Sequence, residues 1–175
     1  MAISIEDIKK LRTMTGAGLA DVKKALTEAE GDFDKAKEIL RERGLAIAAK
    51  RSDRETSNGC VLVKTVDGFA AMVAVKCETD FVAAGKDFVA LVQEILDAAV
   101  AARCKSLDEV KALKLASGDD AATAVQHRSG ITGEKMEIDG YNFIEGSNLS
   151  VYDHMNRHTL ATIVQQAYAL HHGSA

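Results

Sequence analysis

The chain has 175 residues, of which 47% are hydrophobic and 27% are charged, and its formal net charge at pH 7 is −4. This composition supports a packed core and excludes wholesale disorder. No apolar run approaches the roughly 18 residues that a membrane-spanning helix needs, and no basic segment followed by an apolar one opens the chain. We therefore expect a cytoplasmic protein without a secretory signal or a membrane partner.

Charge is unevenly distributed, since residues 1–54 hold 12 Lys and Arg against 10 Asp and Glu, whereas the rest of the chain is acidic. A nucleic-acid-binding protein usually carries a strongly basic domain, so we expect no direct nucleic-acid binding. A protein or small-molecule partner is favoured instead. The cysteines Cys60, Cys77 and Cys104 are odd in number and widely spaced, which indicates thiols in a reducing compartment and not a disulfide framework.

Three helices are predicted at the start of the chain. Ser4 is a capping residue, and apolar residues recur at helical spacing over 5–11, 19–29 and 33–44. The sequence TGAG separates the first two segments, and Gly44 is expected to end the third helix. So small a bundle has little core of its own, and small bundles commonly serve as docking modules.

A β-hairpin and a helix are predicted after a polar linker at residues 51–59. The β-rich runs CVLVKTV and FAAMVAVKC are joined by Asp67-Gly68, and a two-residue Asp-Gly turn between such runs is the strongest short hairpin signal. Apolar residues at helical spacing over 88–99 predict an amphipathic helix. Between strand and helix, KCETDFVAAGKDF places the large aromatic Phe81 at a junction, where either the protein's own core or a partner covers it.

Further elements complete an α+β architecture. Ser106 predicts the cap of a helix that runs through Leu113, a second helix is expected over 119–128, and EKMEIDGYNFIEG and HTLATIVQQ are interpreted as strands. The predicted fold is therefore an N-terminal three-helix bundle followed by an antiparallel sheet with packed helices. The expected divisions are 1–50 for the docking domain, 51–59 for the linker, 60–130 for a first core subdomain and 131–175 for a partial second core subdomain.

Other chemistries are less well supported by the residues. TGAG lacks the Gly-Lys-Ser/Thr ending of a phosphate-binding Walker loop, so a bend between helices is the better interpretation. His154 and His158 stand four residues apart and could ligate a metal on a helix, but no third ligand converges and no metal is expected. A Cys–His nucleophile pair stays open, although nothing marks one cysteine as activated.

Several segments resemble one protein family. LRTMTGAGLADVKKALTEAEGDFDKAKEILRERG, followed by AAKRSDR, resembles the N-terminal domain of bacterial elongation factor Ts, which is similar to a ubiquitin-associated (UBA) domain. CETDFVA resembles that family's Thr-Asp-Phe-Val signature, and SGITGEKMEI and VYDHMNRHTLATIV resemble segments of its core. The resemblance runs from Met1 to about Val164. QQAYALHHGSA then replaces the family's continuation, so the second core subdomain is expected to be incomplete.

The resemblance implies a guanine-nucleotide exchange factor for the GTPase elongation factor Tu, without covalent chemistry and without a cofactor. It implies that the bundle docks on the GTPase. It also implies that Asp80 and Phe81, flanked by Thr79 and Val82, are inserted beside the Mg²⁺ site of the GTPase, which releases GDP. The docking residues that it implies are Arg12, Leu19, Lys23, Arg51 and His154.

Alternatives remain open at this point. A docking or scaffold fragment would bind the GTPase without efficient exchange, whereas a thiol or metal enzyme would use the cysteines and histidines. Phe81 could also fold back onto the protein's own core. Because HTLATIV has no recognisable covering helix, residues 134–175 are expected to be weakly protected or to be shielded by self-association.

Overall fold

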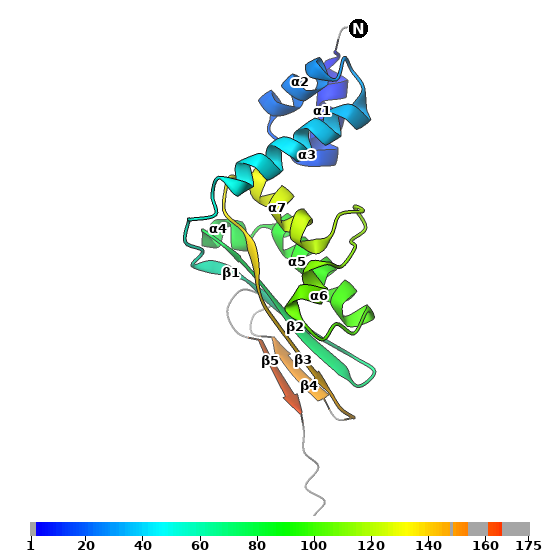
Figure 1. The fold of residues 1–175 in the computed structure, drawn as a ribbon, viewed down its shortest axis with the longest axis vertical. Coiled ribbons are helices and arrows are strands. Elements are labelled where there is room, and N and C mark those ends of the chain that lie inside the picture. The colour runs from blue at the N-terminus through cyan, green and yellow to red at the C-terminus, as the bar shows by residue number, and fades with distance from the viewer. Residues whose placement is uncertain (1–2, 148, 154–160, 166–175) are drawn as a thin grey trace, which may run out of the picture.

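A computed structural model gives the fold and describes residues 3–147, 149–153 and 161–165. Three helices lie at one end of the molecule and a sheet with further helices lies at the other (Figure 1). The first three helices are α1 (Ile5–Thr15), α2 (Leu19–Glu28) and α3 (Phe33–Ala49). They are followed by β1 (Asn58–Val66), β2 (Phe69–Cys77), α4 (Asp80–Ala83), α5 (Lys86–Ala101), α6 (Leu107–Lys111), α7 (Ala121–Thr132), β3 (Glu137–Glu145), β4 (Leu149–Asp153) and β5 (Ala161–Gln165). This arrangement confirms the predicted α+β class.

The bundle helices begin where the sequence supplies caps. Ser4 Oγ accepts a hydrogen bond from the Asp7 N–H at 3.0 Å, and the Asp7 carboxylate accepts one from the Ser4 N–H at 3.1 Å. This capping box satisfies two backbone donors that the first turn leaves without partners. Gly16 ends α1 with a left-handed φ of 69°, and Asp32 caps α3. The buried side chains of the bundle are Leu11, Ala17, Val22, Ala25, Leu26, Ala29, Ala36 and Leu40.

The third helix does not end at Gly44, and that prediction is wrong. Helix α3 continues to Ala49, and Gly44 is a buried residue within it. The reason is packing, because α3 crosses α7 at Gly44 and the backbones of the two helices touch there. The missing side chain serves this close approach and not a left-handed helix terminus.

The predicted hairpin is confirmed. Strands β1 and β2 pair antiparallel, with Val66 opposite Phe69. The two residues between them, Asp67 and Gly68, have φ values of 45° and 73°. Positive φ at both turn positions is the geometry that matches the twist of a two-residue hairpin, and Asp-Gly favours it.

Strand β3 completes a three-stranded antiparallel sheet with the order β1-β2-β3. It confirms the strand expected in EKMEIDGYNFIEG, and Ile138 of this strand is buried, as is Met136 just before it. The weak protection expected over residues 134–175 stays a prediction, and so does the subdomain boundary near residue 130. Strands β4 and β5 form a second antiparallel pair that lies against β1 and β2.

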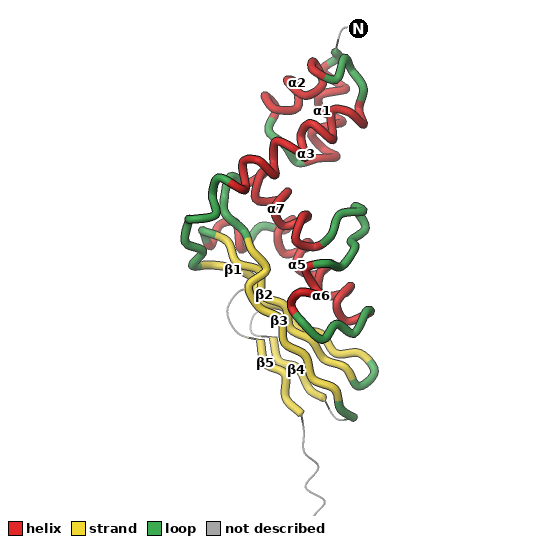
Figure 2. Tube along the Cα trace, in the orientation of Figure 1, coloured by secondary structure: helices red, strands yellow, loops and turns green. Residues whose placement is uncertain are grey.

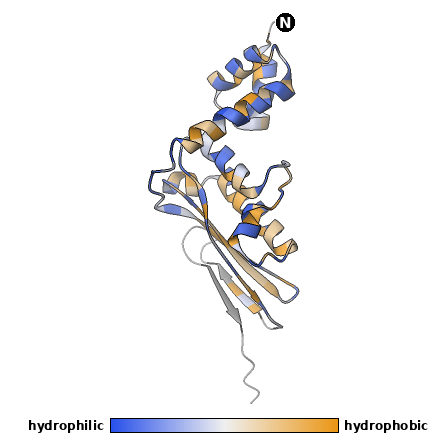
Figure 3. Ribbon diagram, in the orientation of Figure 1, coloured by the Kyte–Doolittle hydropathy of each residue, from blue (hydrophilic) through white to orange (hydrophobic). Residues whose placement is uncertain are grey.

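Helices α5, α6 and α7 lie beside the sheet (Figure 2). Apolar residues follow the strands and the helices next to them, whereas many residues of the bundle helices are hydrophilic (Figure 3). Among the described helices, none combines the length and the hydropathy needed to cross a membrane. The main core includes Cys60, Leu62, Phe69, Val73, Val75, Phe88, Val92, Ile95, Leu96, Val110 and Ile138.

The later helices confirm the predicted types but not all of the predicted ends. Helix α5 matches the stripe expected over 88–99. Helix α6 is capped by Ser106, as predicted, but it ends before Leu113, because the Leu113 carbonyl accepts from the Ala121 N–H at 2.8 Å. Helix α7 starts later than residue 119, because the Asp120 side chain caps it.

Candidate functional site

Phe81 is exposed, and the protein's own core does not cover it. Its side chain is 87% exposed, the largest fraction among the exposed large hydrophobic side chains of the described residues. It lies on α4, a single helical turn between β2 and α5. The alternative in which Phe81 folds back onto the core is therefore wrong. An exposed aromatic of this size is a candidate contact for a partner protein.

Thr79 fixes the start of the helix that carries Phe81. Its Oγ accepts from the Val82 N–H at 3.3 Å, and its carbonyl oxygen accepts from the Ala83 N–H at 3.1 Å. The Cys77 thiol donates to the same carbonyl at 3.2 Å. Burial, followed by the negative charge of Glu134, raises the pKa of Cys77 to about 11, so the thiol keeps the proton that it donates.

One face of α4 packs against the core, and the opposite face is exposed. Ala83 is buried, and Val82 is half-buried against the main core. Asp80 is exposed and lies in the first turn of α4, where a negative charge is favoured by the helix dipole. The signature residues are thus divided between those that hold the turn and those that project from it.

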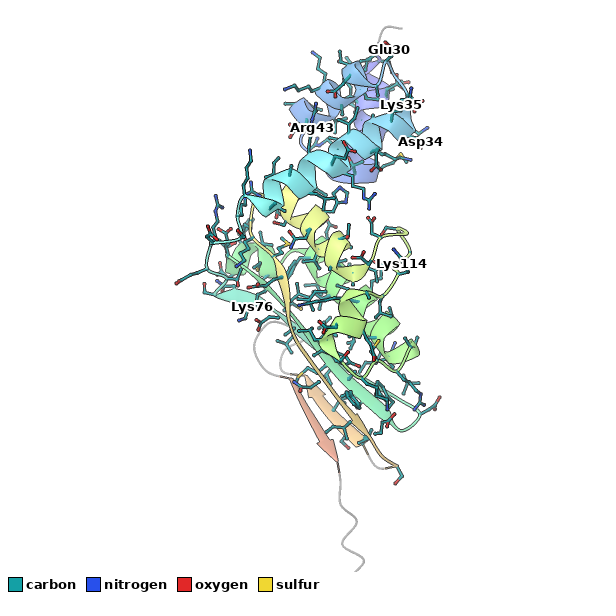
Figure 4. The ribbon with its side chains drawn as sticks, viewed as in Figure 1. Glu30, Asp34, Lys35, Arg43, Lys76 and Lys114 are labelled. Atoms are coloured by element: carbon teal, nitrogen blue, oxygen red, sulfur yellow. The ribbon has the colours of Figure 1, made fainter. Side chains whose placement is uncertain are left out.

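A groove of about 620 Å³ runs beside Asp80. It is lined by the start of β1, the end of β2 and α4, so it adjoins the turn that carries Phe81. Lys76, labelled in Figure 4, lies on its wall and forms an ion pair with Asp139 at 3.0 Å. Charged groups therefore border the groove next to the exposed aromatic.

The predicted docking residues of the bundle lie on its surface. Leu19 and Lys23 are exposed and share one face of α2, because they are four residues apart. Arg12 is exposed in the last turn of α1. Met14, which the sequence analysis did not single out, is also exposed, at 53%. Its spacing of three residues from Leu11 is that of a core position, so the pattern conceals its exposure.

Of the two remaining predicted docking residues, the structure describes Arg51 but not His154. Arg51 is half-buried, and its Nη1 donates to the Ser129 carbonyl oxygen at 3.1 Å. This bond ties the end of α3 to α7, so Arg51 has a role within the chain, and its docking role stays a prediction. His154 lies outside the residues that the structure describes.

The described residues give no support to a thiol or metal enzyme. All three cysteines are buried, and burial raises the pKa of both Cys77 and Cys104, which disfavours the reactive thiolate. Within residues 3–147, 149–153 and 161–165, no group of three or more His, Cys, Asp and Glu side chains is placed to hold a metal ion. Burial also lowers the pKa of His127, a residue of α7 whose side chain lies next to Gly44 of α3.

Comparison with known proteins places residues 78–172 in a match to the family model for elongation factor TS. The chain is 62% identical over 164 residues to an elongation factor Ts of Bacteroides fragilis, a match that covers 94% of this chain and 49% of the relative. It is 59% identical over 178 residues to one of Phocaeicola vulgatus, covering 100% of this chain and 54% of the relative. With one of Porphyromonas gingivalis the identity is 49% over 175 residues, covering 100% and 64%. The chain spans about half the length of the first two relatives.

Proposed function

Since the chain belongs to the elongation factor Ts family, we propose that it binds the GTPase elongation factor Tu and accelerates the release of GDP. Asp80 and Phe81, held by Thr79 and Val82, are inserted beside the Mg²⁺ site of the GTPase. No covalent bond is made or broken, so the protein is an exchange factor and not an enzyme. It works in the cytoplasm, where bacterial translation takes place.

The exposure of Phe81 is the observation that carries this proposal. The side chain is 87% exposed, yet its helical turn is capped by Thr79 and anchored by buried Ala83. Burying a Phe side chain in a partner is worth about 1.5–3 kcal/mol. Because the turn is already ordered, little of that gain is lost in fixing the backbone on binding.

The physics of nucleotide binding explains how such an insertion releases GDP. GDP is held largely through its phosphates and the metal ion that bridges them. A side chain that disfavours those contacts weakens the binding of GDP without touching the nucleotide. By linkage, bound GDP must weaken the binding of the exchange factor by the same factor. A shift of about 10⁴-fold needs about 5.5 kcal/mol of differential binding, more than one Phe supplies. The docking residues on the bundle must therefore contribute binding energy as well.

Release of a fluorescent GDP analogue from elongation factor Tu tests the proposal. We expect the chain to accelerate release and the Phe81→Ala variant to lose most of that acceleration. Val66→Ala is a matched control, because Val66 is an exposed apolar residue at the far end of the hairpin. Equal acceleration by wild type and Phe81→Ala would exclude the insertion mechanism.

A docking fragment without exchange activity is the second candidate, favoured by the fact that the chain spans about half the length of its first relatives. In that case the chain would bind elongation factor Tu and leave GDP release unchanged. Affinity and release rate measured on the same samples separate the two functions.

A further inference from the structure

We infer that Glu134 is a positioning residue that holds Phe81 in the orientation needed by the partner. This inference rests on the proposed function and deepens it. Glu134 lies in the corner between α7 and β3, which we define as residues 133–136. Glu134 is 55 residues away from Thr79 in sequence, but its carboxylate contacts the backbone just before α4.

The Glu134 carboxylate accepts three hydrogen bonds from residues 78 and 79. Oε2 accepts from the N–H groups of Glu78 and Thr79, at 3.2 Å and 3.1 Å. Oε1 accepts from the Thr79 hydroxyl at 2.6 Å. Hydrogen bonds to a carboxylate are stronger than those between neutral groups, so one side chain fixes both the backbone and the hydroxyl of the helix cap.

A second carboxylate makes the reciprocal contact. Glu78 accepts from the Lys135 N–H at 2.6 Å and from Arg54 Nη1 at 3.2 Å. The bond from the Lys135 N–H, followed by Arg54, holds the pKa of Glu78 below its ordinary value. The strand-to-helix junction and the corner thus bind each other through two carboxylates, and we call this pair of contacts the Glu78–Glu134 clamp.

The clamp also connects Phe81 with the end of the bundle. Ser129 Oγ donates to the Glu134 carbonyl oxygen, and the Ser129 carbonyl accepts from Arg51 just after α3. A continuous series of hydrogen bonds therefore leads from the end of the docking bundle to the cap of α4. Two contact surfaces on one chain bind a partner together only when their geometry allows both to engage.

The orientation of Phe81 depends on this clamp because its own side chain has little contact with the core. An 87% exposed side chain is held in place by the backbone that carries it. That backbone is ordered at one end by Thr79, and Thr79 is bound by Glu134. Loosening the clamp should therefore leave Phe81 present but poorly placed, which weakens insertion without removing the aromatic ring.

Two variants of Glu134 test the inference in the full chain. Glu134→Ala removes both acceptor oxygens and with them all three hydrogen bonds, whereas Glu134→Gln keeps the shape but loses the charge. Glu109→Gln is the matched control, since Glu109 also accepts from a backbone N–H, that of Lys105, but lies at α6. We expect kcat/KM for GDP release to fall about tenfold in Glu134→Ala, less in Glu134→Gln and not in the control.

A double variant separates positioning from general destabilisation. Once Phe81→Ala has removed the ring, Glu134→Ala should cause little further loss, because both changes act through the same contact. Fully additive losses in the double variant would overturn the inference. So would a Glu134→Ala protein with wild-type exchange activity.

Hydrogen exchange in the isolated chain tests the clamp without the partner. Amides at residues 78–83 should exchange faster in Glu134→Ala than in wild type or Glu109→Gln. Unchanged exchange at these residues would overturn the inference whatever the activity. If wild type fails to accelerate GDP release although these amides respond as expected, the proposed function is wrong while the clamp itself stands.

Discussion

Gly44 of α3 and Gly130 of α7 meet backbone to backbone. A Cβ placed on Gly130 would lie 2.4 Å from the Cα of Gly44 and 2.5 Å from its carbonyl oxygen, closer than real atoms approach. A Cβ on Gly44 would instead meet the ring of His127, at 3.3 Å from Cδ2, and lie 3.8 Å from the Gly130 Cα. The crossing of the two helices therefore requires glycine strictly on one side only.

This asymmetry predicts different outcomes for two otherwise identical substitutions. Gly130→Ala should lower the free energy of unfolding by about 1–3 kcal/mol, because the α3 backbone must move away. Gly44→Ala should stay within about 1 kcal/mol of wild type, since alanine favours the helix and the His127 side chain can shift. Urea unfolding of the two variants checks this, and equal stabilities would show that the crossing is looser than the distances indicate.

Two phenylalanines seven residues apart should separate stability from activity. Phe81→Ala should leave the free energy of unfolding within about 0.5 kcal/mol of wild type, because the side chain is exposed. Its catalysed GDP release should slow by about tenfold or more. Phe88→Ala should destabilise the fold by about 3–5 kcal/mol, because Phe88 is buried in the main core. Circular dichroism melts and release rates on the same samples would reveal a core role for Phe81 if Phe81→Ala unfolds.

The basic docking residues should affect binding and not folding. Arg12→Ala or Lys23→Ala is expected to weaken binding to elongation factor Tu by about 0.5–3 kcal/mol, while the melting temperature barely changes. Both side chains are exposed on the bundle. Lys111→Ala is a suitable control, because it removes one positive charge from α6, outside the bundle. Calorimetric titration measures the affinities, and a loss as large in the control as in the bundle variants would indicate a general charge effect.

The interface between α3 and α7 should make stability depend on pH through His127. Burial lowers the pKa of His127 below its ordinary 6.5, and Arg41 and Arg128 lower it further, whereas Asp119 and Glu38 act in the opposite direction. The unfolded chain therefore binds the proton at a higher pH than the folded chain does. The His127 contribution to stability is complete above the unfolded pKa and is lost as pH falls toward the folded pKa.

Melting temperatures of wild type and His127→Gln between about pH 7.5 and 5.5 check this prediction. Melting temperature should change less with pH in the variant than in wild type. The other histidines are present in both proteins, so their contribution drops out of the difference. Aspartates and glutamates with lowered pKa values add their own losses only at more acidic pH. If melting temperature depends on pH with the same slope in both proteins, His127 has the same pKa in the folded and the unfolded state, and the prediction is wrong.

The local signals in the sequence determined most of the elements. The Ser4 capping box, the Asp67-Gly68 turn and the apolar stripe over 88–99 are short-range patterns, and each lies where the sequence predicts it. The sequence also identified Phe81 as a residue at a strand-to-helix junction. These features follow from hydrogen bonds and side-chain spacing within a few residues, which is why they are readable without a fold.

Only the tertiary structure decided the roles of Gly44 in α3 and of Glu134 in the corner after α7. Gly44 resembles a helix terminator until Gly130, far along the chain, is found against it. Glu134 carries no local signal at all, because its partners Glu78 and Thr79 are brought to it by the pairing of β2 with β3. Close packing and hydrogen bonds between distant segments depend on which elements become neighbours. Periodicity within one segment contains no information about that choice.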